Sequence, residues 1–451
     1  MGKSFPLVPK KVAPVRTKFR RIATPVPVPE SLPLLEKLRL YEPRSMSGQP
    51  PVIWDHASGV NVFDPYGNMW LDFSSGVLVT NAGHGHPLIV ARLRELIEKP
   101  LLHHYCFPAE PRATLVEKLA TFSPDPLKKI FLLTTGAETV ECALKLCRTW
   151  GKPRGKTVFV SFEGAFHGRT LGAQMVGGMP ALKEWIPHLD PEIVQVPFPG
   201  DPRCQDRSFA VFEKTLQEKG IAPEKVCGVL SETYQGATAA FLPSEYAWDL
   251  RTWCDHYQAL LVFDEVQAGF GRTGKFFGFE HYGILPDLFC LGKGISSSLP
   301  LAAVIGRPEV MDLYEPGTMT STHSGSPLCC AAALGSIEAI EKENLVQHAA
   351  EMGRVFEKRL GLLLERFPDR LLLCGRGLVW GLMFVKAGSL EPDGDAAFEV
   401  VTRCMEKGLL FFAPVGPGAA TIKISPPLSI PEEAVHEGCD VLTETVAEVC
   451  Q

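Results

Sequence analysis

The chain has 451 residues, which is too long for one simple hydrophobic core, so two or three subdomains are expected. Its hydrophobic (45%) and charged (21%) fractions are those of an ordinary soluble globular protein. A formal net charge of -6 gives no reason to expect nucleic acid or an anionic membrane as a partner. The sequence has no run of roughly 18 or more apolar residues, so no membrane span is predicted.

The first 29 residues contain seven Lys or Arg and no acidic residue, together with many prolines. This charge bias resembles a transit peptide, but such segments are Ser-rich and form amphipathic helices, which these prolines would break. We therefore interpret residues 1–48 as a Pro-rich basic arm, extended over the body of the protein or over a partner subunit. The segment lacks the apolar stretch of a secretory signal.

Short alternating runs separated by turn residues predict a small antiparallel meander over residues 52–73. From about residue 113, apolar strand-like runs alternate with helical stretches, which predicts crossover connections and a largely parallel sheet. The candidate strands are residues 129–134, 157–162, 192–197, 226–232, 259–265, 287–292 and 301–306. We predict an α/β fold with a small-domain segment at 49–80, a large domain at 81–327 and a C-terminal small domain at 328–451.

The thirteen cysteines are scattered and include no CxxC pair, so we interpret them as reduced packing residues in a reducing compartment. Histidines 84 and 86, or 103 and 104, are close in sequence. They have no Cys or carboxylate cluster at metal-ligand spacing. Loop or pocket histidines are the preferred interpretation, and no metal site is predicted.

Ligands of open α/β sheets bind at the carboxyl ends of the strands, so the residues that follow each predicted strand are of most interest. Run 129–134 is followed by a small-residue turn and a helix start, which together can bind a phosphate. The predicted strand 259–265 ends in Asp264-Glu265. Lys293 stands between two glycines at the end of the next predicted strand, 287–292. Because a buried carboxylate needs compensation, this arrangement predicts a cation beside Asp264.

The motifs TTGAETVECALKLCR, FEGAFHGRT, SETYQG, LLVFDEVQAGFGRTG, PDLFCLGKGISSSLPLAAVIG and TSTHSGSPLCCAA occur in the order and spacing of one known family. Over roughly residues 50 to 445 the chain resembles the class III (ornithine/GABA-type) aminotransferases, which use pyridoxal phosphate and have fold type I. The resemblance implies a seven-stranded, mostly parallel sheet in a large domain and a smaller α+β domain.

The resemblance also implies roles for individual residues around the cofactor. Lys293 resembles the lysine that forms the Schiff base and then moves the proton. Asp264 resembles the partner that keeps the pyridinium nitrogen protonated, and Gln267 the residue that binds the phenolic oxygen. Gly136 and Ala137 resemble the backbone donors to the phosphate.

Four further positions match the family's cofactor site. Phe166 resembles the aromatic residue that stacks on the ring, where many relatives carry Tyr. Glu232 resembles an acidic residue near the ring and near His167. Thr322 resembles the threonine that reaches the phosphate of a neighbouring subunit, which implies a homodimer with shared active sites.

The substrate side departs from the family pattern. Ala237 stands where ω-amino-acid members carry a glutamate, and Lys423 stands where they carry the arginine which that glutamate masks. We therefore predict that this gating switch is absent, with Lys423 as a point charge for a substrate carboxylate. Arg169 matches a position that often binds the distal carboxylate of 2-oxoglutarate, and Val77 matches the wall of the substrate pocket.

The leading hypothesis is a ping-pong transaminase that moves an amino group from an amino acid or amine to 2-oxoglutarate or pyruvate through a Lys293 Schiff base. Pyridoxal-phosphate-dependent racemases or epimerases, an aminomutase and a decarboxylase of the same fold are the alternative. A non-catalytic protein that retains the fold is a third, and the intact Lys293, Asp264 and Gln267 oppose it. We expect a cytoplasmic protein with small-molecule substrates.

Overall fold

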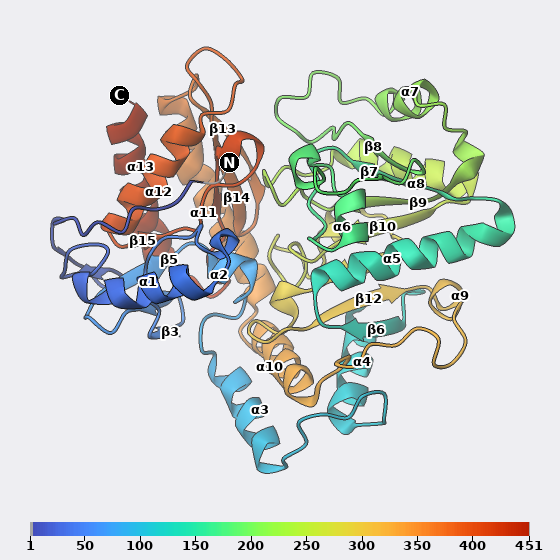
Figure 1. Cartoon of the computed structure of the whole chain (residues 1–451), viewed down its shortest axis with the longest axis horizontal. Helices are drawn as coiled ribbons and strands as arrows, with labels where there is room; N and C mark the ends of the chain where they lie inside the picture. Colours follow the sequence, from blue (N-terminus) through green and yellow to red (C-terminus); the bar gives the residue numbers. More distant parts are fainter. Residues whose placement is uncertain (1–2, 451) are drawn as a thin grey trace. The chain divides into compact units, whose positions relative to one another are not determined.

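The computed structural model describes residues 3–450, which divide into two compact units. The larger unit comprises Pro87–Gly236 and Ala240–Val346. The smaller unit comprises Met1–His86, Ala237–Ala239 and Gln347–Gln451. The chain thus divides at 86/87 and 346/347, whereas the predicted domain boundaries were 80/81 and 327/328. Figure 1 traces both units along the chain.

The larger unit is built on a seven-stranded sheet in the order β6-β12-β11-β10-β9-β7-β8. Only β12 runs antiparallel to its neighbours, and the other pairs are parallel, so the mostly parallel sheet is confirmed. Each strand falls within one predicted run. The strands are β6 (Lys129–Leu133), β7 (Val158–Phe162), β8 (Ile193–Val196), β9 (Val226–Glu232), β10 (Leu260–Asp264), β11 (Leu288–Leu291) and β12 (Ala302–Gly306).

Burial on both faces explains the apolar runs, because every residue of β7, β9, β10, β11 and β12 is buried. Helix α5 (Gly136–Gly151) packs on β9, β11 and β12 through a face that includes Val140, Ala143 and Cys147, as predicted. The other helices of this unit are α3 (Pro87–Glu98), α4 (Glu110–Phe122), α6 (Leu171–Val176), α7 (Ala210–Glu218), α8 (Ser244–Tyr257), α9 (Pro308–Met311) and α10 (Pro327–Lys342).

The smaller unit contains two sheets. The first has the order β1-β2-β5-β4-β3, with β15 (Leu409–Leu410) paired to β5, and β3, β4 and β5 form the predicted antiparallel meander. Its strands are β1 (Val15–Arg16), β2 (Arg21–Ile22), β3 (His56–Ser58), β4 (Asn61–Phe63) and β5 (Met69–Asp72). The second sheet is antiparallel and comprises β13 (Leu371–Arg376), β14 (Val379–Phe384) and β16 (Thr421–Ile424).

Five helices complete the described structure, and four of them lie wholly in the smaller unit. They are α1 (Leu32–Tyr41), α2 (Ser75–Leu78), α11 (Leu345–Arg366), α12 (Gly394–Glu406) and α13 (Glu432–Cys450), of which α11 begins in the larger unit.

The N-terminal arm, residues 3–48, is part of the smaller unit. Its strands β1 and β2 pair with each other, and Arg21 of β2 pairs with Met69 of β5. Phe5, Ile22 and Val26 are buried. The prolines therefore exclude a long helix from the first residues of the arm, but they leave room for a short hairpin that joins the sheet.

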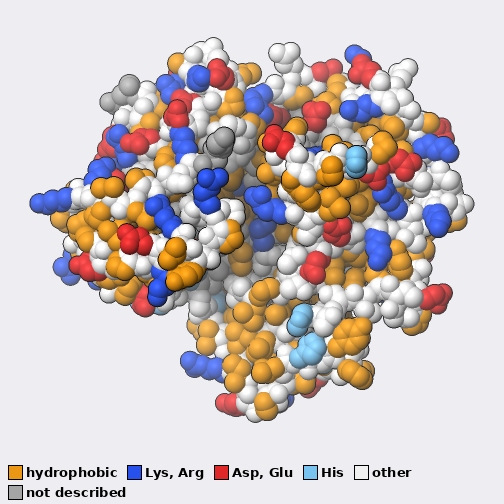
Figure 2. Space-filling model, in the orientation of Figure 1, with side chains coloured by type: hydrophobic (Ala, Val, Ile, Leu, Met, Phe, Trp, Pro, Cys, Tyr) orange, Lys and Arg blue, Asp and Glu red, His pale blue; other side chains and the backbone are white. Residues whose placement is uncertain are grey.

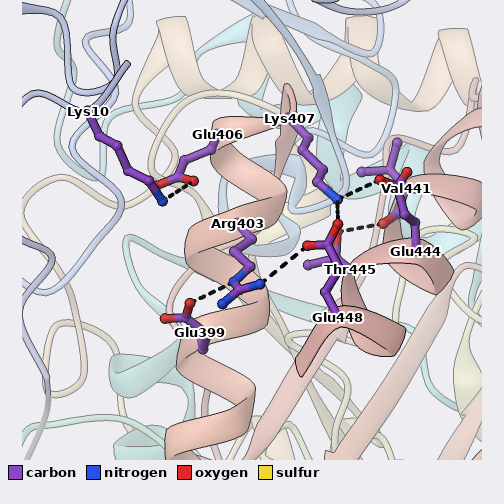
Figure 3. A network of polar contacts seen from close by, with 9 residues as sticks. All are labelled: Lys10, Glu399, Arg403, Glu406, Lys407, Val441, Glu444, Thr445 and Glu448. Atoms are coloured by element: carbon purple, nitrogen blue, oxygen red, sulfur yellow. Dashed lines mark hydrogen bonds and ion pairs between the residues drawn. The ribbon is translucent and has the colours of Figure 1, made fainter. Parts of the chain in front are cut away.

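The basic side chains of the arm meet acidic side chains of the C-terminal helices. Lys10 Nζ lies 2.8 Å from Glu406 Oε2, and Arg20 Nε lies 2.6 Å from Glu437 Oε1. Lys3 and Lys18 pair with Asp395 and Glu433. Figure 3 shows the Lys10 pair beside the ion pairs of Arg403 and Lys407 with Glu448.

None of the thirteen cysteines, all of which lie among the described residues, forms a disulfide. Eight are buried: Cys142, Cys147, Cys227, Cys254, Cys290, Cys330, Cys404 and Cys439. Burial raises the pKa of Cys142 to about 12, which keeps this thiol protonated and unreactive. Residues 3–450 include no helix long and apolar enough to cross a membrane.

Candidate active site

The strand-end residues singled out in the sequence gather at one edge of the seven-stranded sheet. We call the last residues of β6, β7, β9, β10 and β11, together with the residues that follow them, the carboxyl edge. Asp264 ends β10, and in the strand register it lies opposite Glu232 of β9 and Cys290 of β11. Parallel strands deliver their last residues to the same edge, which explains why residues far apart in sequence meet here.

Asp264 is 6% exposed, and both of its oxygens are bound. Oδ2 lies 2.8 Å from Nδ1 of His167, and Oδ1 accepts a hydrogen bond from the backbone N–H of Val266 at 3.0 Å. His167 is itself buried, and its Nε2 has no hydrogen-bond partner within residues 3–450. The histidine therefore fixes the orientation of the carboxylate, as second partners do at many active sites.

Lys293 is separated from β11 by Gly292 alone and begins a short 3₁₀ turn, Lys293–Ile295. Its φ of 44° lies in the left-handed region, which a non-glycine residue adopts at a cost of order 1 kcal/mol. Burial lowers the pKa of the Lys293 amine, and the nearby Asp264 and Glu232 oppose this shift. A lysine with a lowered pKa supplies more of the neutral amine, which is the nucleophilic form.

Glu232 is 4% exposed and accepts two backbone hydrogen bonds. Its Oε2 binds the N–H of Phe166 at 3.1 Å, and its Oε1 binds the N–H of Gly236 at 2.8 Å. Burial raises the pKa of this carboxyl to about 7. Two buried acids, Glu232 and Asp264, therefore lie near the Lys293 amine at the carboxyl edge.

The start of α5 forms an anion cradle. Thr135 caps the helix, and Glu138 Oε2 accepts hydrogen bonds from the backbone N–H groups of Thr134 (2.9 Å) and Thr135 (2.8 Å). Gly136 and Ala137 are the first two residues of the helix, where N–H groups have no acceptor within it. A Cβ on Gly136 would lie 2.8 Å from Val266 Cγ1, so only glycine permits this close packing.

Phe166 and Gln267 lie on the loops that follow β7 and β10. The Phe166 side chain is half-buried, and the guanidinium of the exposed Arg169 lies over its ring at 5.6 Å. The backbone oxygen of Gln267 accepts a hydrogen bond from the Tyr234 hydroxyl at 3.1 Å. In the described chain, Gln267 Oε1 is buried without a hydrogen-bond partner.

Three predicted site residues are not brought to the carboxyl edge by any described contact. Thr322 is exposed in the connection between α9 and α10. Val77 and Lys423 belong to the smaller unit, where Val77 is 42% exposed with φ of 66° and Lys423 is 1% exposed in β16. Their predicted roles stay predictions.

The sequence reasoning assigned no role to two residues of the edge. Glu265 is 1% exposed, and it accepts hydrogen bonds from the N–H groups of Gly278 (2.6 Å) and Phe279 (2.9 Å) and from the Thr233 hydroxyl. Val266 fills the space beside Gly136 and Gly292. Successive side chains of a strand point to opposite faces of the sheet. This alternation could have indicated that Glu265 faces away from Asp264 and has different partners.

These residues fit pyridoxal phosphate. The cofactor offers an aldehyde, a ring nitrogen, a phenolic oxygen and a phosphate, which match the Lys293 amine, the Asp264 carboxylate, the Gln267 amide and the first turn of α5. The partnerless Gln267 Oε1 and His167 Nε2 are the observations that test this fit, since buried polar atoms without partners mark a place that a ligand completes.

Comparisons with known proteins place this chain in a family. The family model described as aminotransferase class III matches residues 44–446. The 4-aminobutyrate aminotransferase of Mycobacterium leprae is 33% identical over 445 residues, which cover 95% of this chain and 98% of that protein. The acetylornithine aminotransferase of Methanopyrus kandleri is 37% identical over 333 residues, covering 74% and 80% of the two chains.

Solved structures agree with the sequence comparisons. The amine transaminase from an uncultivated Pseudomonas species, in its PLP-bound form, superposes with a TM-score of 0.82 at 25% identity. The match covers 88% of this chain and 95% of that one. The chain therefore belongs to the class III aminotransferases and is a pyridoxal-phosphate-dependent enzyme of fold type I.

Proposed function

We propose that this enzyme moves an amino group from an amino acid or amine to 2-oxoglutarate or pyruvate in two ping-pong half-reactions, with Lys293 as its catalytic base. The observation that carries the proposal is the position of the Lys293 amine. It belongs to a half-buried side chain at the carboxyl edge, near the carboxylates of Asp264 and Glu232 that bear on its pKa. A lysine in such surroundings has the lowered proton affinity that proton transfer at neutral pH requires.

Pyridoxal phosphate supplies an electron sink for the pair left when a substrate C–H bond breaks. Asp264, which His167 orients, would hold a proton on the ring nitrogen of the bound cofactor. Lys293 Nζ would hold the cofactor and, once freed by the substrate, would carry the proton that amino transfer moves. Phe166 would cover one ring face, Gln267 would bind the phenolic oxygen, and the N–H groups of Gly136 and Ala137 would bind the phosphate.

The substrates are proposed at the level of chemical class. The relatives named above act on 4-aminobutyrate and acetylornithine. Ala237 and Lys423 replace the glutamate and arginine of the gating pair, so we propose a binding surface for the substrate carboxylate that lacks the switch. Arg169 is exposed, and we propose that it binds the distal carboxylate of 2-oxoglutarate and that Val77 contributes an apolar wall.

The test is Lys293→Ala, with Lys275→Ala as the matched control, because Lys275 is an exposed lysine outside the site. We expect Lys293→Ala to lose more than about 10³-fold in turnover in an amine-donor screen with pyruvate and 2-oxoglutarate. Lys275→Ala keeps the parental rate. Parental turnover in Lys293→Ala, or loss of optical rotation in a single amino acid without amino transfer, would refute the proposal.

A homodimer in the cytoplasm is the proposed working form. Large apolar side chains at the end of α3 and in the segment between α3 and α4 are exposed, among them Ile97 (58%), Leu102 (58%) and Phe107 (72%). Figure 2 shows hydrophobic side chains gathered on the part of the surface over α3 and α10. Such a patch favours a protein partner. The unpaired cysteines support a reducing compartment.

A further inference from the structure

Glu232 is a buried carboxylate with no cationic partner of its own. Among residues 3–450, no Lys, Arg or His lies within ion-pair distance of it, whereas the neighbouring Asp264 pairs with His167. Because a buried charge is costly without compensation, Glu232 depends on the electrostatic effect of the nearby His167 and on its two backbone hydrogen bonds, which are its direct contacts. This unusual environment calls for a role beyond packing.

The two hydrogen bonds join two separate segments of the larger unit. Phe166 belongs to the loop after β7, and Gly236 belongs to the turn after β9. Gly236 in turn lies against Gln267, since a Cβ on Gly236 would come within 2.2 Å of Gln267 Nε2. One carboxylate therefore holds both the aromatic residue and the turn that supports the amide.

The charge of Glu232 also acts on the amine. The titratable groups that face it are Asp264 from β10, His167 from the loop after β7, and Lys293 from the segment after β11. Asp264 and Glu232 both favour the protonated Lys293 amine and oppose the effect of burial. Glu232 thus supplies a second negative charge whose position is fixed by the same two hydrogen bonds.

We propose that Glu232 is a positioning residue that joins the Phe166 loop to the Gly236 turn and holds a negative charge near the Lys293 amine. The two hydrogen bonds of Glu232 are a property of the protein alone. Only their effect on the cofactor ring rests on the proposed function.

Glu265 provides a matched control. It is equally buried, it also accepts two backbone hydrogen bonds, from Gly278 and Phe279, and burial also raises its pKa to about 7. Its two backbone donors lie in a different segment, although the Thr233 hydroxyl also binds it, and it is not among the groups that act on the Lys293 amine. Glu265→Gln therefore reproduces the loss of a buried carboxylate without the proposed role.

The experiment compares hydrogen exchange of the two holoenzyme variants with that of the parent. A Gln side chain has one acceptor oxygen and one NH₂ group, which cannot accept a bond from a backbone N–H. Glu232→Gln therefore loses one of the two hydrogen bonds with Phe166 and Gly236. We expect about tenfold faster exchange or more in peptides covering 163–169 or 233–236, and parental exchange in 277–280. Glu265→Gln should show faster exchange in 277–280 and parental exchange in 163–169, the segment that it does not contact.

A second readout follows the amine. Removing the Glu232 charge should move the pH at which the holoenzyme spectrum titrates to a lower value, while Glu265→Gln leaves it in place. Parental exchange at 163–169 and 233–236 in Glu232→Gln, or the same exchange pattern and spectral titration in both variants, would overturn the proposal. Neither outcome depends on which substrates the enzyme accepts, so a failed donor screen is a separate result.

Discussion

The carboxyl edge and the N-terminal arm use charged residues in opposite ways. At the edge, Asp264, Glu232 and Lys293 lie close together in a site built from loops on rigid strands. In the arm, Lys10 and Lys18 form one-to-one ion pairs and stay largely exposed, at 62% and 68% of the side chain. Charge at the edge therefore changes protonation and reactivity, while charge in the arm only adds a small contribution to folding.

Removing a charge at the edge should have the largest effect. Asp264→Asn keeps the shape of the side chain but loses the charge that holds the proton on the ring nitrogen, so we expect kcat/KM to fall by about 10²–10³-fold. Asp249→Asn, at an exposed aspartate of α8, should leave kcat/KM unchanged. An equal effect of both substitutions would remove the distinction between edge and surface.

The buried Glu265 should give an intermediate effect that depends on pH. Its carboxyl has a pKa raised from 4.5 to about 7, so the folded chain holds this proton more tightly than the unfolded chain. Its contribution to stability is complete below about pH 4.5 and is lost as pH rises through 7, up to about 3 kcal/mol. In Glu265→Gln, the fall in Tm between pH 5 and 7 should be shallower than in the parent.

The arm should give the smallest effect. Lys18→Ala removes an exposed ion pair with Glu433, so we expect at most about 1 kcal/mol of destabilisation at low salt. The difference in Tm should vanish in 1 M salt, where charges are screened over a few ångströms. A large or salt-independent loss would mean that the arm acts through packing and not through charge.

The sequence predicted the larger unit well because its signals are local. Seven apolar runs predict the seven strands. The alternation of strands and helices then predicts that the residue after each run lies at the end of a strand. The roles of Gln267 and Phe166 came only from the family resemblance, since nothing in their spacing specifies a ring or an oxygen. The orientation of the Glu265 side chain depends on a hydrogen bond from Gly278, which lies in a loop more than ten residues away.

The smaller unit was harder to predict because its contacts are distant in sequence. Lys10 meets Glu406, and Trp70 donates to the backbone oxygen of Met405. No periodicity in one segment can reveal such a partner. The arm could be recognised as basic and proline-rich, but the acidic helices that pair with it could not be assigned without the structure.

The division of the smaller unit between the two ends of the chain has a consequence for synthesis. Residues 87–346 of the larger unit are nearly contiguous and can begin to fold as soon as they leave the ribosome. Strand β5 and the buried Trp70, by contrast, must wait for residues 405–410, which emerge later. During translation this half-made sheet exposes its apolar face, so nascent chains stalled before residue 405 should be the species that recruits chaperones.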